Sequence, residues 1–179
     1  MIGVDEVGRG AWAGPLLVCA ARLTSPVEGL RDSKKLSARQ REQLNSKILD
    51  AADIGYGWVS ASDIDVLGLS ASLKLATKQA LEAICPADDE QIIIDGTVNF
   101  APQYKSSITA VKADDSYPCV SAASIVAKVA RDKYMKTLDD TFPEYKFGTH
   151  VGYGTRVHSE AIRMHGLCAE HRKSFRLPI

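Results

Sequence analysis

The sequence has only four cysteines, none of them in a Cys-x-x-Cys pair, and no histidine spacing that matches a zinc site. Cys19, Cys85 and Cys119 lie among apolar or small residues and are predicted to be core thiols. This pattern favours a reduced, cytoplasmic protein over a disulfide-stapled scaffold.

Long apolar runs are missing as well, because no stretch approaches the length of a membrane span. The N-terminus has neither the basic segment nor the apolar core of a signal peptide, so we expect no signal peptide and no membrane contact. Internal repeats and low-complexity linkers are absent from the sequence. With 179 residues, 45% of them hydrophobic, the chain is predicted to form a single domain over 1–179 and to be a monomer.

An excess of charge of either sign is also lacking, since Lys+Arg and Asp+Glu both number 22. Mean charge therefore gives no indication of a polyanionic partner, but the positive residues are unevenly distributed. Two basic clusters can each be either a solvated face or a phosphate-binding surface. They are Arg31, Lys34, Lys35, Arg39 and Arg41, and Arg156, Arg163, Arg172, Lys173 and Arg176.

The most informative stretch is the beginning of the chain, where a short apolar strand over 2–5 leads to Asp5 and Glu6 and then to Gly8-Arg9-Gly10. Carboxylates at a strand end suit Mg²⁺ or Mn²⁺, and a glycine-flanked arginine can present N–H groups to a phosphate or sugar. The same residues can also be surface acids in a hairpin turn. Neighbouring strand side chains point to opposite faces, so one shared site predicts that the strand ends or bulges between Asp5 and Glu6.

Hydrophobic periodicity predicts alternating strands and helices in the rest of the chain. Ser37 and Gln40 form a capping-box pattern that starts a helix, and three consecutive isoleucines indicate a central strand buried on both faces. The expected strands are 15–24, 54–61, 91–96 and 106–112. The expected helices are 37–52, 69–84, 118–140 and 155–165, with 142–154 irregular.

Further candidate site residues follow these elements. Asp95 ends a predicted strand and Asp114 follows the next one, and ligands of open α/β sheets bind at strand ends. Asp95-Gly96 is equally typical of a turn. Lys128 can reach a phosphate or extend into solvent. Tyr153, between two glycines, can be a stacking platform or can close the core.

Six stretches occur in an order that resembles the ribonuclease HII family. They are Asp5 to Gly10, Asp32 to Leu36, Ile94 to Gly96, Lys112 to Asp114, Ser121 to Lys128 and Gly152-Tyr153. The resemblance runs from residue 2 to the segment 171–175. It implies an α/β ribonuclease H-like fold, with a central mixed β-sheet flanked by helices and a small C-terminal helical part over about 142–179.

The activity that the resemblance implies is hydrolysis of the RNA strand of RNA–DNA hybrids. It also implies cleavage 5′ to single ribonucleotides in duplex DNA, leaving 3′-hydroxyl and 5′-phosphate ends. The resemblance further implies that two divalent ions, Mg²⁺ or Mn²⁺, assist hydrolysis of the phosphodiester bond. By resemblance the catalytic metal ligands are Asp5, Glu6, Asp95 and Asp114. Asp132 is the alternative fourth acid and is given a structural or supporting role.

The same resemblance assigns the contacts to nucleic acid. Gly8, Arg9 and Gly10 match the turn that reads the ribose 2′-hydroxyl, the group that distinguishes RNA from DNA. Tyr153 matches a tyrosine that stacks on the deoxyribose after the ribonucleotide. The expected contacts to backbone phosphates are Lys34, Lys35, Ser121 and Lys128.

The sequence departs from the family pattern at two places. Ala11-Trp12 stands where proline often follows the Gly-Arg-Gly turn, and Val151 and Gly154 flank the tyrosine segment where lysine and proline are usual. We expect a lost phosphate contact and a looser loop. Two other functions are the alternatives. A non-catalytic hybrid-binding module would lack one of the four acids, and all four are present. Another α/β phosphotransferase would carry a nucleotide loop or a nucleophilic Asp motif, and the sequence has neither.

Overall fold

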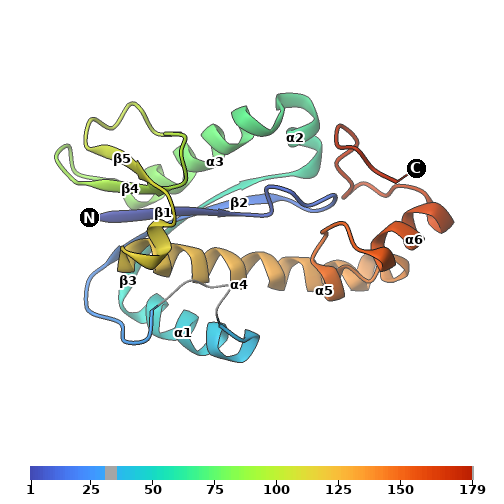
Figure 1. Ribbon diagram of the computed structural model, residues 1–179, viewed down its shortest axis with the longest axis horizontal. Helices are drawn as coiled ribbons and strands as arrows, with labels where there is room; N and C mark the ends of the chain where they lie inside the picture. Colours follow the sequence, from blue (N-terminus) through green and yellow to red (C-terminus); the bar gives the residue numbers. More distant parts are fainter. Residues whose placement is uncertain (31–35, 179) are drawn as a thin grey trace.

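A computed structural model describes residues 1–30 and 36–178, so the predicted contacts Lys34 and Lys35 lie outside the described residues. Its centre is one five-stranded sheet in the order β3-β2-β1-β4-β5 (Figure 1). β2 pairs antiparallel with β1 and β3, whereas β1, β4 and β5 run parallel, which confirms the predicted mixed sheet. The strands are β1 (Ile2–Val7), β2 (Leu16–Leu23), β3 (Ala52–Val59), β4 (Ile92–Asp95) and β5 (Ser107–Ala110).

Helices cover both faces of this sheet, with α3 on one side and the long α4 on the other, where α1 packs against α4 (Figure 1). The helices are α1 (Ala38–Asp50), α2 (Ala61–Leu67), α3 (Leu69–Ile84), α4 (Pro118–Thr141), α5 (Phe147–His150) and α6 (Arg156–His165). Two short 3₁₀ helices are η2 (Ala113–Asp115) and η3 (Pro143–Tyr145). No helix in the described ranges is long and apolar enough to cross a membrane.

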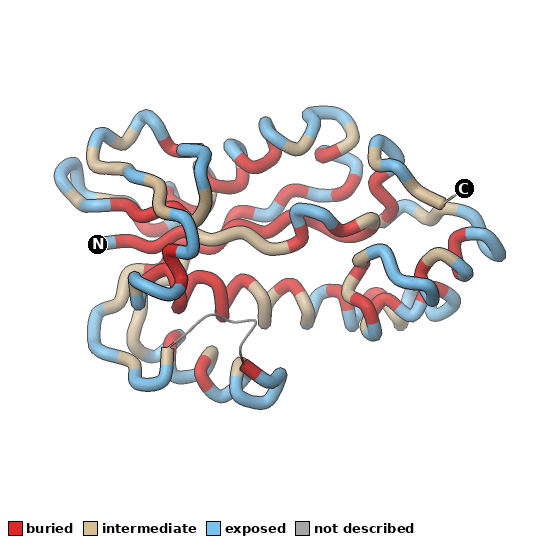
Figure 2. Tube along the Cα trace, in the orientation of Figure 1, coloured by how far each residue is buried: buried red, intermediate tan, exposed pale blue. Residues whose placement is uncertain are grey.

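The two largest hydrophobic clusters of the described residues follow from the alternation of side chains along β2, which is almost wholly buried (Figure 2). Leu16, Val18 and Ala20 pack toward α3, and the alternate residues Leu17, Cys19 and Ala21 pack toward α1 and α4. Close approach of α3 to β3 requires glycine, because a Cβ on Gly57 would lie 1.8 Å from the carbonyl oxygen of Ala76.

Most predicted elements are confirmed, including the capping box in which Ser37 and Gln40 exchange hydrogen bonds. Helix α2 is not among the predictions; its N-cap Ser60 accepts a hydrogen bond from the Asp63 backbone, a signal that the predicted strand over 54–61 obscured. The segment 142–154 is not irregular throughout, since it contains η3 and α5. Cys85 is exposed at the end of α3, so its prediction as a core thiol was wrong.

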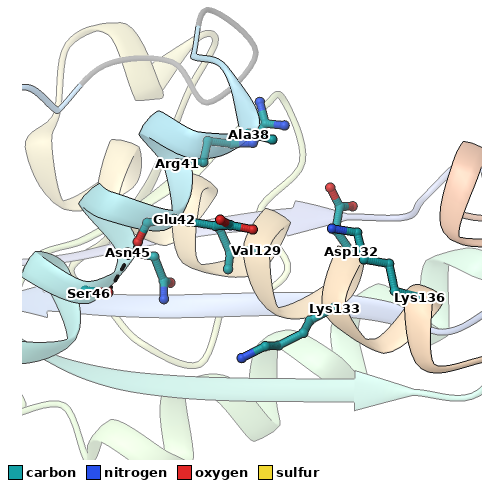
Figure 3. Close-up of a pocket in the computed structure, with 9 residues that line it drawn as sticks. All are labelled: Ala38, Arg41, Glu42, Asn45, Ser46, Val129, Asp132, Lys133 and Lys136. Carbon is teal, nitrogen blue, oxygen red and sulfur yellow. Dashed lines mark hydrogen bonds between the residues drawn. The ribbon is translucent and has the colours of Figure 1, made fainter.

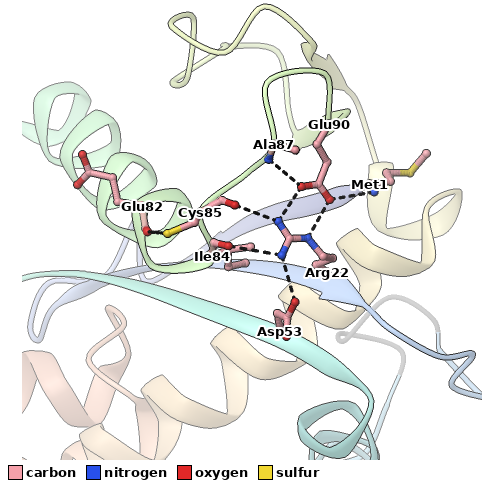
Figure 4. A network of polar contacts seen from close by, with 8 residues as sticks. All are labelled: Met1, Arg22, Asp53, Glu82, Ile84, Cys85, Ala87 and Glu90. Carbon is pink, nitrogen blue, oxygen red and sulfur yellow. Dashed lines mark hydrogen bonds and ion pairs between the residues drawn. The ribbon is translucent and has the colours of Figure 1, made fainter.

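The N-terminal end of β1 is tied to its neighbours by a polar network around Arg22 (Figure 4). The Arg22 guanidinium donates to both carboxylate oxygens of Glu90, at 2.9 and 2.6 Å, and to Asp53 at 3.1 Å. The bonds from Arg22 hold the pKa of Glu90 down at about 2. This network joins β2, β3 and the chain before β4 at the end of the sheet that is remote from Asp5 and Glu6.

The C-terminal part packs on the second half of α4 through its own apolar cluster, which includes Met135, Tyr145 and Phe147. Ala13, from the chain between β1 and β2, belongs to the same cluster and forms an isolated bridge with His171. The two ends of the sequence therefore meet beside the turn that follows β1.

Candidate active site

A pocket of about 380 Å³ lies at the C-terminal ends of β1 and β4. It gathers residues from five separate parts of the chain, and among them are three of the four predicted metal ligands. The lining residues are Asp5, Glu6, Val7, Gly8, Arg9, Gly10, Arg41, Asp95, Ser124, Lys128 and Tyr153.

Asp5 and Glu6 both line this pocket although the strand neither ends nor bulges between them. β1 stays paired with β2 as far as Val7, so the predicted strand break was wrong. Pairing of β1 with β4 stops earlier, at Val4. Because the β4 side of β1 is unpaired beyond that point, the longer Glu6 side chain can reach the pocket from the edge of the sheet.

Asp5 is the most strongly perturbed acid of the pocket. Its carboxylate accepts hydrogen bonds from the Glu6 backbone, at 2.8 Å, and from the Ser124 side chain. Burial, assisted by the charges of Glu6 and Asp95, raises the pKa of Asp5 to about 7. Ser124 was not predicted as a site residue, although it lies in the family-like stretch 121–128.

Glu6 carries a weaker form of the same perturbation. Burial raises its pKa, Arg9 opposes the shift, and the Asp95 charge adds to it. The Arg9 guanidinium lies 3.5 Å from a Glu6 carboxylate oxygen, so the arginine of the Gly-Arg-Gly turn faces the acids. This contact couples the turn to the acidic pocket.

Asp95 and Asp114 are connected through the backbone of η2. The Ala113 N–H donates to the Asp95 carboxylate at 2.8 Å, which holds η2 against the end of β4. Asp114 is buried, 7% exposed, and is not among the described residues that line the pocket. The buried Ser121 hydroxyl donates to the Asp114 carbonyl oxygen, an internal bond that does not favour its predicted phosphate contact.

The donor set of the pocket suits a hard divalent cation, because three carboxylates line it and burial raises the pKa values of two of them, Asp5 and Glu6. Across residues 1–30 and 36–178, no three His, Cys, Asp or Glu side chains are already gathered as a metal cage. The ligand roles of Asp5, Glu6, Asp95 and Asp114 stay predictions.

This electrostatic strain predicts how stability depends on pH without metal. The folded state keeps a proton on Asp5 up to about pH 7, whereas the unfolded chain releases it near the ordinary value of 3.8. Folding is therefore weakened as pH rises through this window, by about 2–4 kcal/mol. Urea unfolding in EDTA should show wild type losing this stability between about pH 4 and pH 7 relative to Asp5→Asn, and Mg²⁺ should restore it. A parallel pH dependence of the two proteins would contradict the assignment.

Cationic residues border the acids on the α4 side. Lys128 lines the pocket and forms an ion pair with Asp132 at 2.8 Å. Arg41 lines the pocket and also a neighbouring cleft of about 200 Å³ between α1 and α4 (Figure 3). Asp132 lines that second cleft and, like Asp114, is not among the described residues that line the acidic pocket, so its supporting role stays a prediction. Arg41 was noted in the sequence only as part of a basic cluster.

Two buried arginines fix the turn beside the acids, and neither was predicted to do so. Arg131 is fully buried in α4 and donates to the carbonyl oxygens of Pro15, Val151 and Ala13, at 2.8, 2.8 and 3.1 Å. A Cβ on Gly8, where φ is +86°, would lie 2.3 Å from Nε of Arg131. Glycine at position 8 therefore lets the turn lie against the guanidinium.

Arg172 completes this support from the C-terminal segment. It is fully buried and donates to the carbonyl oxygens of Gly14 and Arg9, at 3.0 and 3.1 Å. Its place in a basic cluster suggested an exposed face, which is wrong for this residue. Burial lowers the pKa of Arg172 to about 10, so it remains a cation at neutral pH behind the Gly-Arg-Gly turn.

Tyr153 is half-buried at the edge of the pocket, with the Arg131 guanidinium carbon 5.6 Å from its ring centre. Gly154, where we predicted a looser loop, lies against the ring of Trp12. A Cβ on Gly154 would lie 2.4 Å from the Trp12 ring, so the indole occupies that space. Two of the residues that depart from the family pattern, Trp12 and Gly154, are thus in direct contact.

Comparison with known proteins agrees with this architecture. Residues 2–177 match the family model described as Ribonuclease HII. A ribonuclease HII from Shewanella loihica is 44% identical over 179 residues, covering 97% of this chain and 86% of that protein. The ribonuclease HII in a complex with PCNA from Archaeoglobus fulgidus superposes with a TM-score of 0.82 at 26% identity, covering 96% of this chain and 91% of its own. Ribonuclease H2 from Pyrococcus horikoshii superposes with a TM-score of 0.75 at 28% identity, covering 99% of this chain and 94% of its own.

Fold and relatives together define the class as metal-dependent endonucleases with a ribonuclease H fold. Within that class, the chain belongs to the ribonuclease HII family. The family resemblance of the sequence motifs is confirmed.

Proposed function

We propose that the protein cuts the RNA strand of RNA–DNA hybrids and also cuts on the 5′ side of single ribonucleotides in duplex DNA, leaving 3′-hydroxyl and 5′-phosphate ends. The observation that carries the proposal is that one pocket contains three acids, the Gly-Arg-Gly turn and Tyr153. Acids and sugar-recognition elements in one pocket support cleavage at the sugar that is recognised.

In this proposal Asp5, Glu6, Asp95 and Asp114 hold two divalent ions, Mg²⁺ or Mn²⁺. When bound, the ions supply an activated water and stabilise the leaving 3′-oxygen. The hydrogen bonds from Ser124 to Asp5 and from Ala113 to Asp95 keep these two carboxylates oriented toward the pocket. Arg9, Arg41 and Lys128 offset the charge of the bound phosphodiester.

Selection of the ribonucleotide is assigned to the turn of Gly8, Arg9 and Gly10. A Cβ on Gly10 would meet no atom within 4 Å, so this part of the turn is open to close approach by a sugar. The Arg172 contact to the Arg9 carbonyl holds the turn in shape. Tyr153 would stack on the following deoxyribose, a contact that suits the junction between RNA and DNA.

The direct test is a duplex DNA that carries one ribonucleotide, incubated with the protein and Mg²⁺ or Mn²⁺. We expect one cut on the 5′ side of the ribonucleotide, and mass spectrometry should identify 3′-hydroxyl and 5′-phosphate ends. An all-DNA duplex and a reaction in EDTA are the controls and should stay intact. If a long hybrid is cut but the single ribonucleotide is not, the excision activity is overturned while the hybrid activity stands.

A further inference from the structure

A chain of hydrogen bonds runs from the backbone of Tyr153 into the C-terminal part of the molecule. His158 and His171 are buried, with exposed fractions of 0% and 1%. His158 Nδ1 lies 3.0 Å from the Tyr153 carbonyl oxygen, and the two Nε2 atoms are 3.1 Å apart. His171 Nδ1 lies 3.0 Å from the Cys168 backbone nitrogen and 3.1 Å from its Sγ.

The partners determine where each proton lies. A carbonyl oxygen only accepts, so His158 Nδ1 donates to Tyr153 and its Nε2 is left as an acceptor. His171 Nε2 must then donate to His158, which leaves His171 Nδ1 to accept from Cys168. Every member is satisfied when both rings are neutral. Burial lowers the pKa of His158 to about 4 and also lowers that of His171, in agreement with neutral rings.

The other carbonyl groups around Tyr153 are held by different elements. Arg131 binds the Val151 carbonyl oxygen, and the Trp12 backbone N–H donates to Gly152 at 2.8 Å. The contact from His158 connects the Tyr153 carbonyl oxygen to α6. His158 lies in the first turn of this helix, and its own backbone N–H donates to the N-cap Thr155 at 3.2 Å. The side chain therefore reaches back from the first turn of α6 to the tyrosine.

We propose that His158, oriented by His171 and Cys168, is a positioning residue that holds Tyr153 at the angle needed to recognise the step from ribonucleotide to deoxyribonucleotide. The proposal rests on the proposed function, in which Tyr153 stacks on the sugar that follows the ribonucleotide. It assigns junction specificity to a group that lies outside the pocket and does not touch substrate.

The test compares cleavage of two substrates, a duplex with one ribonucleotide and a long RNA–DNA hybrid. His158→Phe keeps an aromatic ring but loses both nitrogens, so cleavage at the single ribonucleotide should fall roughly 5- to 10-fold while cleavage of the hybrid changes less than about twofold. His158→Asn keeps a donor near the Nδ1 position and should retain most of the junction cleavage. A merely structural role would reduce cleavage of both substrates alike.

A double-mutant cycle with Tyr153→Ala tests whether His158 acts through the tyrosine. Tyr153→Ala should itself weaken junction cleavage more than hybrid cleavage, and adding His158→Phe should cost nothing further. Additive losses, or equal losses on both substrates, would overturn the proposal. If wild type cuts neither substrate, the proposed function has failed instead. The hydrogen-bond chain can then still be tested by measuring where the protons of His158 and His171 lie.

Nitrogen-15 NMR of the histidine side chains in the wild-type protein supplies that second measurement. At neutral pH we expect His158 to carry its proton on Nδ1 and His171 on Nε2. The opposite tautomer at His158, or a charged ring, would overturn the proposal even if His158→Phe did not fold.

Discussion

Replacing Asp95 by asparagine should reduce cleavage of a single-ribonucleotide duplex on the order of 10³-fold, because one anionic ligand of the divalent ions is lost. The amide is nearly isosteric and its oxygen can still accept the hydrogen bond from the Ala113 backbone. The fold should therefore be retained. Single-turnover rates in saturating Mg²⁺ measure the effect.

The matched control for this variant is Asp89→Asn, which removes one exposed acid from the loop before β4. It should leave the cleavage rate unchanged within about twofold, since that loop is at the other end of the strand. Without metal, Asp95→Asn should also be no less stable than wild type, because the negative charge of Asp95, which opposes ionisation of Asp5 and Glu6, has been removed. An Asp95→Asn rate within tenfold of wild type would refute the assignment of Asp95 as a ligand.

Replacing Arg131 by methionine should lower the free energy of unfolding by about 3–5 kcal/mol. The change keeps much of the side-chain length but leaves the carbonyl oxygens of Pro15, Val151 and Ala13 without their donor in a buried site. Urea unfolding measures the loss. Arg131→Lys should recover only part of it, because one ammonium group cannot reproduce the planar fork of donors.

Lys133→Met is the control for Arg131→Met, since it makes a similar exchange two residues along the same helix at an exposed position. Its stability should stay within about 0.5 kcal/mol of wild type. Arg131 also touches the turn at Gly8 and the ring of Tyr153, so its loss should weaken substrate binding under conditions where the variant is folded. Wild-type stability in Arg131→Met would show that the three carbonyl contacts contribute little.

The main elements and the acids of the pocket were predictable because their signals are local. Ser37 and Gln40 are three residues apart, so the capping box can be read directly from the chain. Three isoleucines followed by Asp95 predict a buried strand with an acid at its end, and β4 has this form. Such patterns depend on the backbone period and on neighbouring residues alone.

For the opening stretch, the sequence predicted which residues line the pocket but not the geometry that brings them together. Asp5 and Glu6 were expected to share a site only through a break in the strand, yet β1 continues to Val7. What brings both acids to one pocket is that β4 stops pairing at Ile94 while β2 goes on to Leu17. The lengths of partner strands, far away in sequence, decided this feature.

The sequence by itself therefore determined the family, the order of the five strands and the four longer helices, and the candidate acids, because each depends on residues that are close along the chain. Only the tertiary structure decided how the turn and Tyr153 are supported. Arg131 reaches across 116 residues to Pro15 and Arg172 across 158 residues to Gly14. Their contacts, like the packing of Trp12 on Gly154 and the bond from His171 to His158, depend on packing between segments, which no local pattern encodes.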